Sequence, residues 1–126
     1  MMLKHADLTE VIIECFYDVY KTLGYGFLEK VYENGLLHRL RRQGVTVTAQ
    51  HPLKVMDVDG TILGEYFADL FVDSRLVVEL KACRALADEH VAQLLDYLRA
   101  SRVEHGMLIN FGSSRLEIRK YVLTDS

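Results

Sequence analysis

The sequence has few cysteines and no long apolar run, and each shortage excludes a class of protein. Cys15 and Cys83 match neither a paired-cysteine zinc spacing nor a dense disulfide framework, so we expect two free, reduced thiols. No apolar run approaches the roughly twenty residues that a membrane span needs. Residues 1–12 lack the basic start and apolar stretch of a signal peptide. We therefore expect a cytoplasmic protein without a membrane segment.

An excess of positive charge is missing as well. Fifteen Lys and Arg residues stand against eighteen Asp and Glu residues, which leaves a net charge of −3. The molecule as a whole is therefore not a cationic surface for nucleic acid, and any such surface must be local. One proline, eight glycines and 50% apolar residues are typical of a globular chain, and the length predicts a single domain over residues 1–126.

The spacing of apolar residues predicts an α/β (α+β) fold. Apolar positions recur at helical intervals in three segments, and β-branched or continuous apolar runs mark five strands. The expected helices are Leu8 to Leu23, Phe27 to Gln43 and Leu86 to Arg102, and the expected strands are Val45 to Val58, Ile62 to Val72, Leu76 to Ala82, Met107 to Phe111 and Arg115 to Val122. We expect the first three strands to form an antiparallel meander, and the third helix to make the third and fourth strands parallel in a mixed sheet.

Two charged residues interrupt the apolar strand expected at residues 76–82. Strand alternation puts Glu79 and Lys81 on one face, roughly 7 Å apart, and burying either charge alone is costly. Asp69 is a similar charge in the preceding strand. A three-residue turn over residues 73–75 would place Asp69 directly opposite Glu79, whereas a two-residue turn would put them on opposite faces.

Two facing carboxylates repel each other unless a cation lies between them, and oxygen ligands of this kind suit Mg²⁺. The Leu80 carbonyl could supply another oxygen, and Lys81 could position a water or stabilise charge that grows on phosphorus. The pattern therefore predicts a site for phosphodiester hydrolysis. The alternative from spacing alone is an edge-strand ion pair of Glu79 with Lys81, together with an Asp69 that faces solvent.

These residues also carry a resemblance. Asp69 followed by Glu79-Leu80-Lys81 resembles the D…E-x-K signature of the PD-(D/E)XK nuclease superfamily, and the order of elements is similar to its restriction-endonuclease-like core. The segment GFLEKVY, from Gly26 to Tyr32, resembles the motif of the GxxExxY family within that superfamily. The segments HVAQLLDY from His90 and GMLINFG from Gly106 also resemble that family.

The likeness runs from about Leu8 to Val122 and includes two departures. Ala68 stands where the superfamily name has a proline, and Tyr25 stands where the family more often has a proline. Neither change removes a residue that the resemblance implies as a ligand.

The resemblance implies a metal site and a catalytic lysine. Asp69 and Glu79 would be metal ligands for Mg²⁺, with Mn²⁺ as a substitute, and Lys81 would be the catalytic lysine. Glu29 would be a further acidic group that reaches the metal through water. The alternative for Glu29 is an acid in the first turn of the second helix, where the helix dipole favours it in any case.

The third helix carries further candidates. Gln93 and Tyr97 lie four residues apart on one helix face, and the resemblance implies that they orient the lysine or contact a phosphate, with Tyr32 as a further candidate. The alternative for Gln93 and Tyr97 is a hydrogen-bonded pair on the helix surface. Three arginines, which either contact a nucleic-acid backbone or form a solvated helix end, are Arg39, Arg41 and Arg42.

The function expected from these residues is that of a Mg²⁺-dependent nuclease acting on nucleic acid, with DNA favoured and with structure-selective or non-specific cleavage. One alternative is a non-cleaving nucleic-acid-binding module that retains the fold. Another is an oligomeric protein in which Asp69, Glu79 and Lys81 form a structural polar network. The strand from Arg115 to Val122 is a candidate homodimer seam, and a protein partner could supply specificity.

Overall fold

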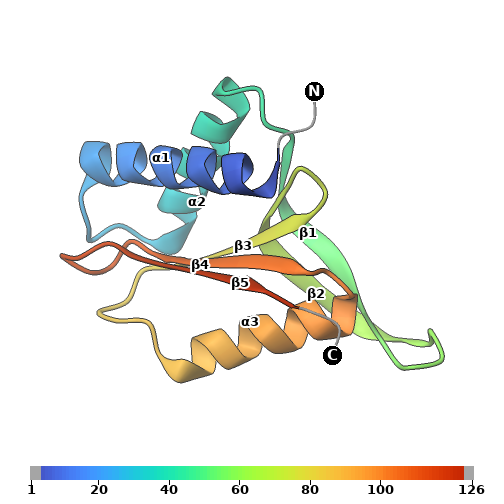
Figure 1. Cartoon of the computed structure of the whole chain (residues 1–126). Helices are drawn as coiled ribbons and strands as arrows, with labels where there is room; N and C mark the ends of the chain where they lie inside the picture. The colour runs from blue at the N-terminus through green and yellow to red at the C-terminus, as the bar shows by residue number, and fades with distance from the viewer. Residues whose placement is uncertain (1–3, 124–126) are drawn as a thin grey trace.

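The computed structural model describes residues 4–123 and contains the elements in the predicted order (Figure 1). The helices are α1 (His5–Leu23), α2 (Glu29–Arg42) and α3 (Asp88–Ser101), and the strands are β1 (Val47–Met56), β2 (Ile62–Val72), β3 (Leu76–Lys81), β4 (His105–Asn110) and β5 (Glu117–Val122). Within residues 4–123, no helix is long and apolar enough to cross a membrane. Both cysteines are unpaired, as predicted.

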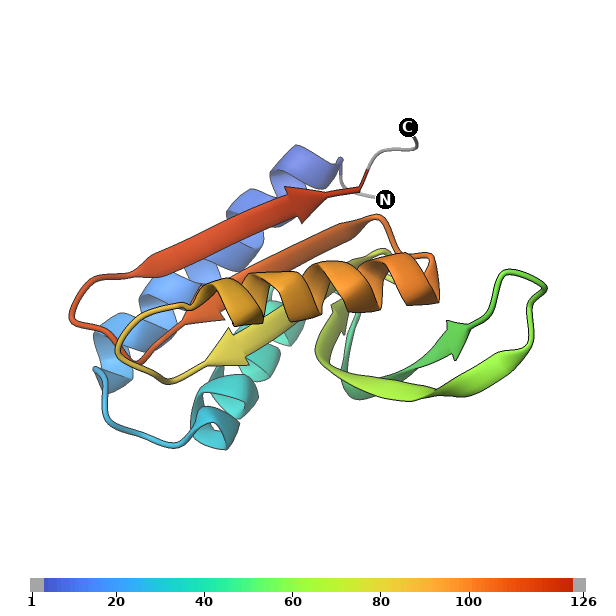
Figure 2. The ribbon, with the colours of Figure 1, turned by 90° about the horizontal axis from the view of Figure 1, so that it is seen from below.

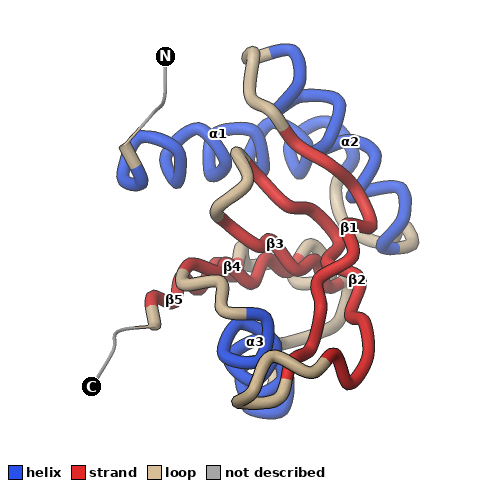
Figure 3. The backbone as a smooth tube through the Cα atoms, turned by 90° about the vertical axis from the view of Figure 1, so that its right-hand side faces the viewer, coloured by secondary structure: helices blue, strands red, loops and turns tan. Residues whose placement is uncertain are grey.

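The five strands form one mixed sheet in the order β1-β2-β3-β4-β5. Neighbouring strands are antiparallel except β3 and β4, which are parallel and are connected by α3. Helices α1 and α2 cover one face of the sheet and α3 covers the other (Figures 1 and 3). The predicted mixed sheet, its meander and its one parallel pair are therefore confirmed.

The central strand β3 is buried on both faces, which explains its nearly continuous apolar sequence. Val78 and Leu80 belong to the core beneath α1 and α2, where Phe16 and Phe111 also pack. Val77 belongs to the smaller core beneath α3. Because side chains alternate along a strand, Glu79 and Lys81 share the α3 face with Val77.

The β1–β2 hairpin bends as it leaves the sheet, and its tip extends away from the rest of the chain (Figure 2). In β2, Leu70 packs in the core under α1 and α2, whereas Ala68 packs in the core under α3. The position between them is Asp69. Its counterpart in β1 is Gln50, whose φ of 51° is in the left-handed region. The bend therefore passes through one row of the hairpin, at Gln50 and Asp69.

The strands β2 and β3 separate next to Asp69, where the hairpin bends. Their paired residues extend from Val72 and Leu76 to Leu70 and Val78, and β3 then continues beside β4 as far as Lys81. Farther along, β2 keeps only β1 as its partner and curves toward the α3 side (Figure 3). The divergence leaves Asp69 and Glu79 at the start of a gap between two strands.

A buried asparagine fixes the segment that connects β3 to α3. The fully buried Asn110 accepts hydrogen bonds from the Cys83 and Gly112 N–H groups, both at 3.0 Å, and donates to the Cys83 carbonyl at 2.9 Å. It also donates to the Glu117 carboxylate at 2.9 Å, which in turn accepts the Leu86 N–H at 3.1 Å. The end of β3 and the approach to α3 are therefore held against β4 and β5.

This close packing predicts that Gly112→Ala destabilises the protein by about 2 kcal/mol or more. A Cβ at position 112 would lie 2.2 Å from the Cys83 nitrogen and 2.3 Å from the Ala82 carbonyl carbon, and both are backbone atoms. Gly64→Ala is the matched control, since a Cβ there meets nothing within 4 Å. Urea denaturation of the two variants should separate them clearly, and equal midpoints would show that the segment can shift freely.

Candidate active site

Asp69 and Glu79 lie across from each other where β2 and β3 diverge. The turn over residues 73–75 closes with Val72 opposite Leu76, so of the two turns that the sequence left open the structure has the three-residue one. The Asp69 N–H donates to the Glu79 carboxylate at 3.4 Å, and the Leu80 N–H donates to Oδ2 of Asp69 at 2.9 Å. The two carboxylates therefore bridge the strands beyond the last paired residues.

A third acidic residue, Glu33 of α2, joins them from the other face of the sheet. Its side chain is buried, with the residue only 3% exposed, and it forms an ion pair with Lys30. Gln50 donates to Glu33 at 2.6 Å, and the same amide nitrogen lies 3.4 Å from Oδ1 of Asp69. Gln50 therefore links the acid of α2 to the acid of β2.

Neither Glu33 nor Gln50 was predicted from the sequence as a site residue. Glu33 carried a weak signal, because it lies four residues after Glu29 on the same helix. Gln50 carried none, because its contact depends on a left-handed backbone conformation that its surroundings in a β-branched run do not indicate.

Glu29 is the first residue of α2, and its side chain is exposed. It is close enough to the acidic cluster that its charge helps to raise the pKa of Glu79. This position suits both expectations for Glu29, the first-turn helix acid and the acidic group that reaches a metal through water.

Burial makes the two central carboxylates hard to ionise. The pKa of Glu79 is raised to about 8, and desolvation is the largest cause. The charges of Glu33 and Glu29 add to this rise, whereas the Asp69 N–H and the Lys81 charge oppose it. Desolvation also raises the pKa of Asp69, although the hydrogen bond from Leu80 lowers it. A bound cation would relieve this cost, because it favours the charged form of every neighbouring acid.

Lys81 and Glu79 share a pocket of about 170 Å³ with residues of α3. Gln93 donates to the Tyr97 hydroxyl at 3.2 Å, and the Tyr97 ring stacks on Tyr66 with centroids 3.7 Å apart. The full lining is Tyr66, Glu79, Lys81, His90, Gln93, Leu94, Tyr97 and Leu108. The fold therefore brings Gln93 and Tyr97 to the same pocket as the acid and the lysine.

The structural alternative, an edge-strand ion pair of Glu79 with Lys81 beside an Asp69 that faces solvent, has three requirements that the structure does not meet. The strand β3 lies at the centre of the sheet and not at its edge. Among the ion pairs of residues 4–123, none joins Glu79 to Lys81. The Asp69 carboxylate accepts hydrogen bonds from Leu80 and Gln50 and does not simply face solvent.

Tyr32 lies in the core and does not line the pocket to which Gln93 and Tyr97 belong. The residue is fully buried, and its ring stacks on Phe111 with centroids 4.4 Å apart. Its hydroxyl donates to the Gly24 carbonyl at 2.6 Å and accepts the Phe27 N–H at 3.2 Å. Tyr32 therefore holds the connection between α1 and α2, and it positions Glu29 only through that connection.

The donor set of the site fits a hard divalent cation. Asp69 and Glu79 offer carboxylate oxygens, and the Leu80 carbonyl directly follows Glu79 in the sequence. Mg²⁺ is usually held by one or two carboxylates, with waters and substrate phosphates as its other ligands. Within the part of the chain that the structure describes, no cluster of three or more His, Cys, Asp or Glu side chains is arranged to hold an ion. The carboxylates of Asp69 and Glu79 meet the requirement of a hard divalent cation for oxygen ligands.

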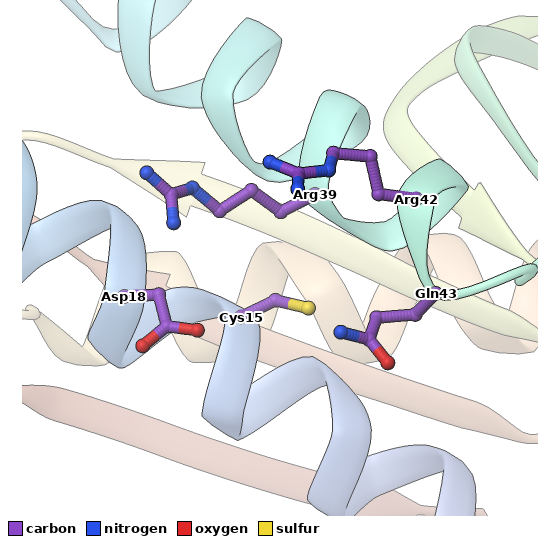
Figure 4. A pocket seen from close by; sticks show the side chains of 5 residues that line it. All are labelled: Cys15, Asp18, Arg39, Arg42 and Gln43. Carbon is purple, nitrogen blue, oxygen red and sulfur yellow. The ribbon is translucent and has the colours of Figure 1, made fainter.

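A second pocket, of about 210 Å³, lies between α1 and the C-terminal end of α2 (Figure 4). Arg39 and Arg42 reach it from α2, and Asp18 faces them from α1 (Figure 4). Arg39 donates to the Thr22 hydroxyl at 3.0 Å, and Arg41 donates to the Val47 carbonyl at 3.1 Å. The three arginines lie at the opposite end of α2 from Glu29, so this pocket is separate from the acidic site.

Comparison with known proteins gives one family and one fold. A family model described as the PD-(D/E)XK nuclease superfamily matches residues 6–121. No curated protein matches the chain. A solved structure entitled "Crystal structure of SSO0001" superposes with a TM-score of 0.58 at 20% identity over 93% of this chain. The chain spans 58% of the length of that protein, and the likeness shows a shared fold.

The raised pKa of Glu79 predicts how stability depends on pH in metal-free buffer. Its pKa is about 8 in the folded protein against an ordinary 4.5, so the folded state binds the extra proton between these values. The contribution of Glu79 to the free energy of unfolding is fully present below pH 4.5. This contribution, on the order of 3 kcal/mol, is lost as the pH rises through 8. We expect Glu79→Gln to flatten this dependence.

Urea denaturation of both proteins in EDTA, from pH 5 to pH 9, measures the effect. Asp96→Asn is the control, because the Asp96 side chain is 73% exposed and forms its ion pair with Arg99 on the same helix. It should keep the slope of the parent protein. Parallel curves for the parent and Glu79→Gln would contradict the prediction.

Proposed function

Since the chain belongs to the PD-(D/E)XK nuclease superfamily, we propose that it is a divalent-metal-dependent nuclease that hydrolyses phosphodiester bonds in nucleic acid, with DNA as the favoured substrate. One observation carries this proposal. Asp69 and Glu79 meet where β2 and β3 diverge, and Lys81 faces the same pocket as Glu79. Two acids and an amine thus lie on adjoining strands, and one of the acids, Glu79, shares its pocket with the amine.

Asp69, Glu79 and the Leu80 carbonyl would hold Mg²⁺, or Mn²⁺ in its place. Such an ion polarises a phosphodiester and lowers the pKa of a bound water. The protein orients its own ligands for this purpose. The Leu80 N–H and Gln50 fix the Asp69 carboxylate, and the Asp69 N–H fixes that of Glu79.

Lys81 supplies the positive charge of the proposed site. Its side chain is half-buried beside Glu79, where it can position the attacking water or stabilise the negative charge that grows on phosphorus. Gln93 and Tyr97 stand at the other side of the same pocket and would orient the lysine or contact a phosphate. Glu29, exposed at the start of α2, would act on the ion through water.

The GxxExxY family is the proposed subgroup. The contacts of Tyr32 support it, because its hydroxyl bonds to Gly24 and Phe27 and so ties the tyrosine of GFLEKVY to residues on either side of the motif's glycine, Gly26. We further propose structure-selective or non-specific cleavage, a cytoplasmic location, and a protein partner as the source of any specificity. A homodimer through the edge strand β5 belongs to the same proposal.

A cleavage assay tests the function. Labelled single-stranded, duplex and branched DNA and RNA would be incubated with Mg²⁺ or Mn²⁺ and with the parent protein, Asp69→Asn or Lys81→Met. We expect cleavage by the parent and a loss of about 100-fold or more in both variants, since each removes a group that acts on the developing charge. Asp96→Asn and Lys120→Ala, which change the same residue types at exposed positions, should cut normally.

Melting curves of the same samples, with Mg²⁺ present, separate catalysis from folding. Lys81→Met should melt within a few degrees of the parent if the lysine is catalytic, whereas a strong loss of stability would favour the structural polar network. Binding without any cleavage by the parent protein would contradict the nuclease proposal and favour a non-cleaving module.

A further inference from the structure

His90 lines the pocket that contains Glu79 and Lys81, and the proposed reaction leaves it without a task. It lies near the start of α3, one helical turn before Gln93 and two before Tyr97. Its side chain is half-buried, so one part of the ring contacts the protein and another can face the pocket.

One hydrogen bond determines which ring nitrogen of His90 carries the proton. The Ala87 N–H donates to Nδ1 of His90 at 3.0 Å. A backbone N–H is always a donor, so Nδ1 must be the acceptor, and the neutral ring then carries its proton on Nε2. The imidazole therefore presents an N–H donor, and not a lone pair, at the edge away from the backbone.

This protonation state excludes two roles for His90. A metal ligand or a general base needs an unprotonated nitrogen, and the only one in this ring is occupied by Ala87. Donation to a negatively charged oxygen is the role that remains. Lys81 and Gln93 add further donors to the pocket, so three donors surround a space that adjoins the acidic ligands.

We propose that His90 binds nucleic acid by donating its Nε2–H to a non-bridging oxygen of the phosphodiester. This inference rests on the proposed nuclease function. Glu79, on the strand side of the pocket, would hold the cation, and His90, on the helix side, would hold the anion. The first turn of α3 would then bind phosphate, and the hydrogen bond from Ala87 would fix the tautomer of the His90 imidazole.

Two nearly isosteric substitutions isolate the donor. Both Gln and Glu at this helical position can accept the Ala87 N–H, as the third residue of a capping box does. His90→Gln therefore keeps the backbone contact and an N–H donor, whereas His90→Glu keeps the contact but puts a carboxylate in the pocket. Ala92→Glu is the control for charge alone, because Ala92 is exposed on the same helix and is not a pocket residue.

The measurement is the affinity for labelled single-stranded and duplex DNA, by fluorescence anisotropy, with Ca²⁺ as the hard cation and melting curves for each variant. We expect His90→Gln and Ala92→Glu to bind within about threefold of the parent, and His90→Glu to bind at least about tenfold more weakly. All variants should melt alike.

Equal binding by His90→Glu and the parent would overturn the assignment, and so would equal losses in His90→Glu and Ala92→Glu. Either result would leave the nuclease proposal intact. Failure of the parent protein both to bind and to cut any nucleic acid would instead overturn the nuclease proposal and, with it, the role of His90.

Discussion

The hydrogen bond from the Leu80 N–H to the Asp69 carboxylate spans the point at which β2 and β3 part. Two strands that separate leave unpaired backbone groups, and a buried group of that kind must find a partner. Here a carboxylate is the partner on one strand, and the Asp69 N–H donates to Glu79 on the other. The divergence of the sheet and the pairing of the two acids are therefore one feature, and the pocket beside α3 depends on it.

The same feature places charge where it is costly. The protein holds Asp69, Glu79 and Glu33 close together. Glu33 is buried and the other two are half-buried, and burial makes ionisation of Asp69 and Glu79 harder. A core built for stability alone would use apolar residues at these positions. The cost is consistent with a site that a cation and a phosphate complete, because both would pair with groups that the fold already orients.

Much of the fold follows from the sequence, and the reasons are local. Apolar periodicity predicted every helix and strand to within a few residues. The sequence left two turns open at residues 73–75, and the structure has the three-residue one, which places Asp69 across from Glu79. The candidates Glu79, Lys81, Gln93 and Tyr97 line one pocket. The sequence did not predict Gln50, whose role requires a left-handed residue within a strand. Nothing in the sequence indicated that the Tyr32 hydroxyl bonds to the loop between α1 and α2.

If Asp69 and Glu79 form a divalent-cation site, calorimetric titration of the metal-free protein with Mn²⁺ at pH 7 should detect it. We expect saturable binding that is lost in Asp69→Asn and kept in Asp96→Asn. We also expect a heat that varies with the ionisation enthalpy of the buffer, because the ion must displace a proton from Glu79, whose pKa is about 8. Equal binding by the parent and Asp69→Asn, or no binding by either, would contradict a cation site at these two residues.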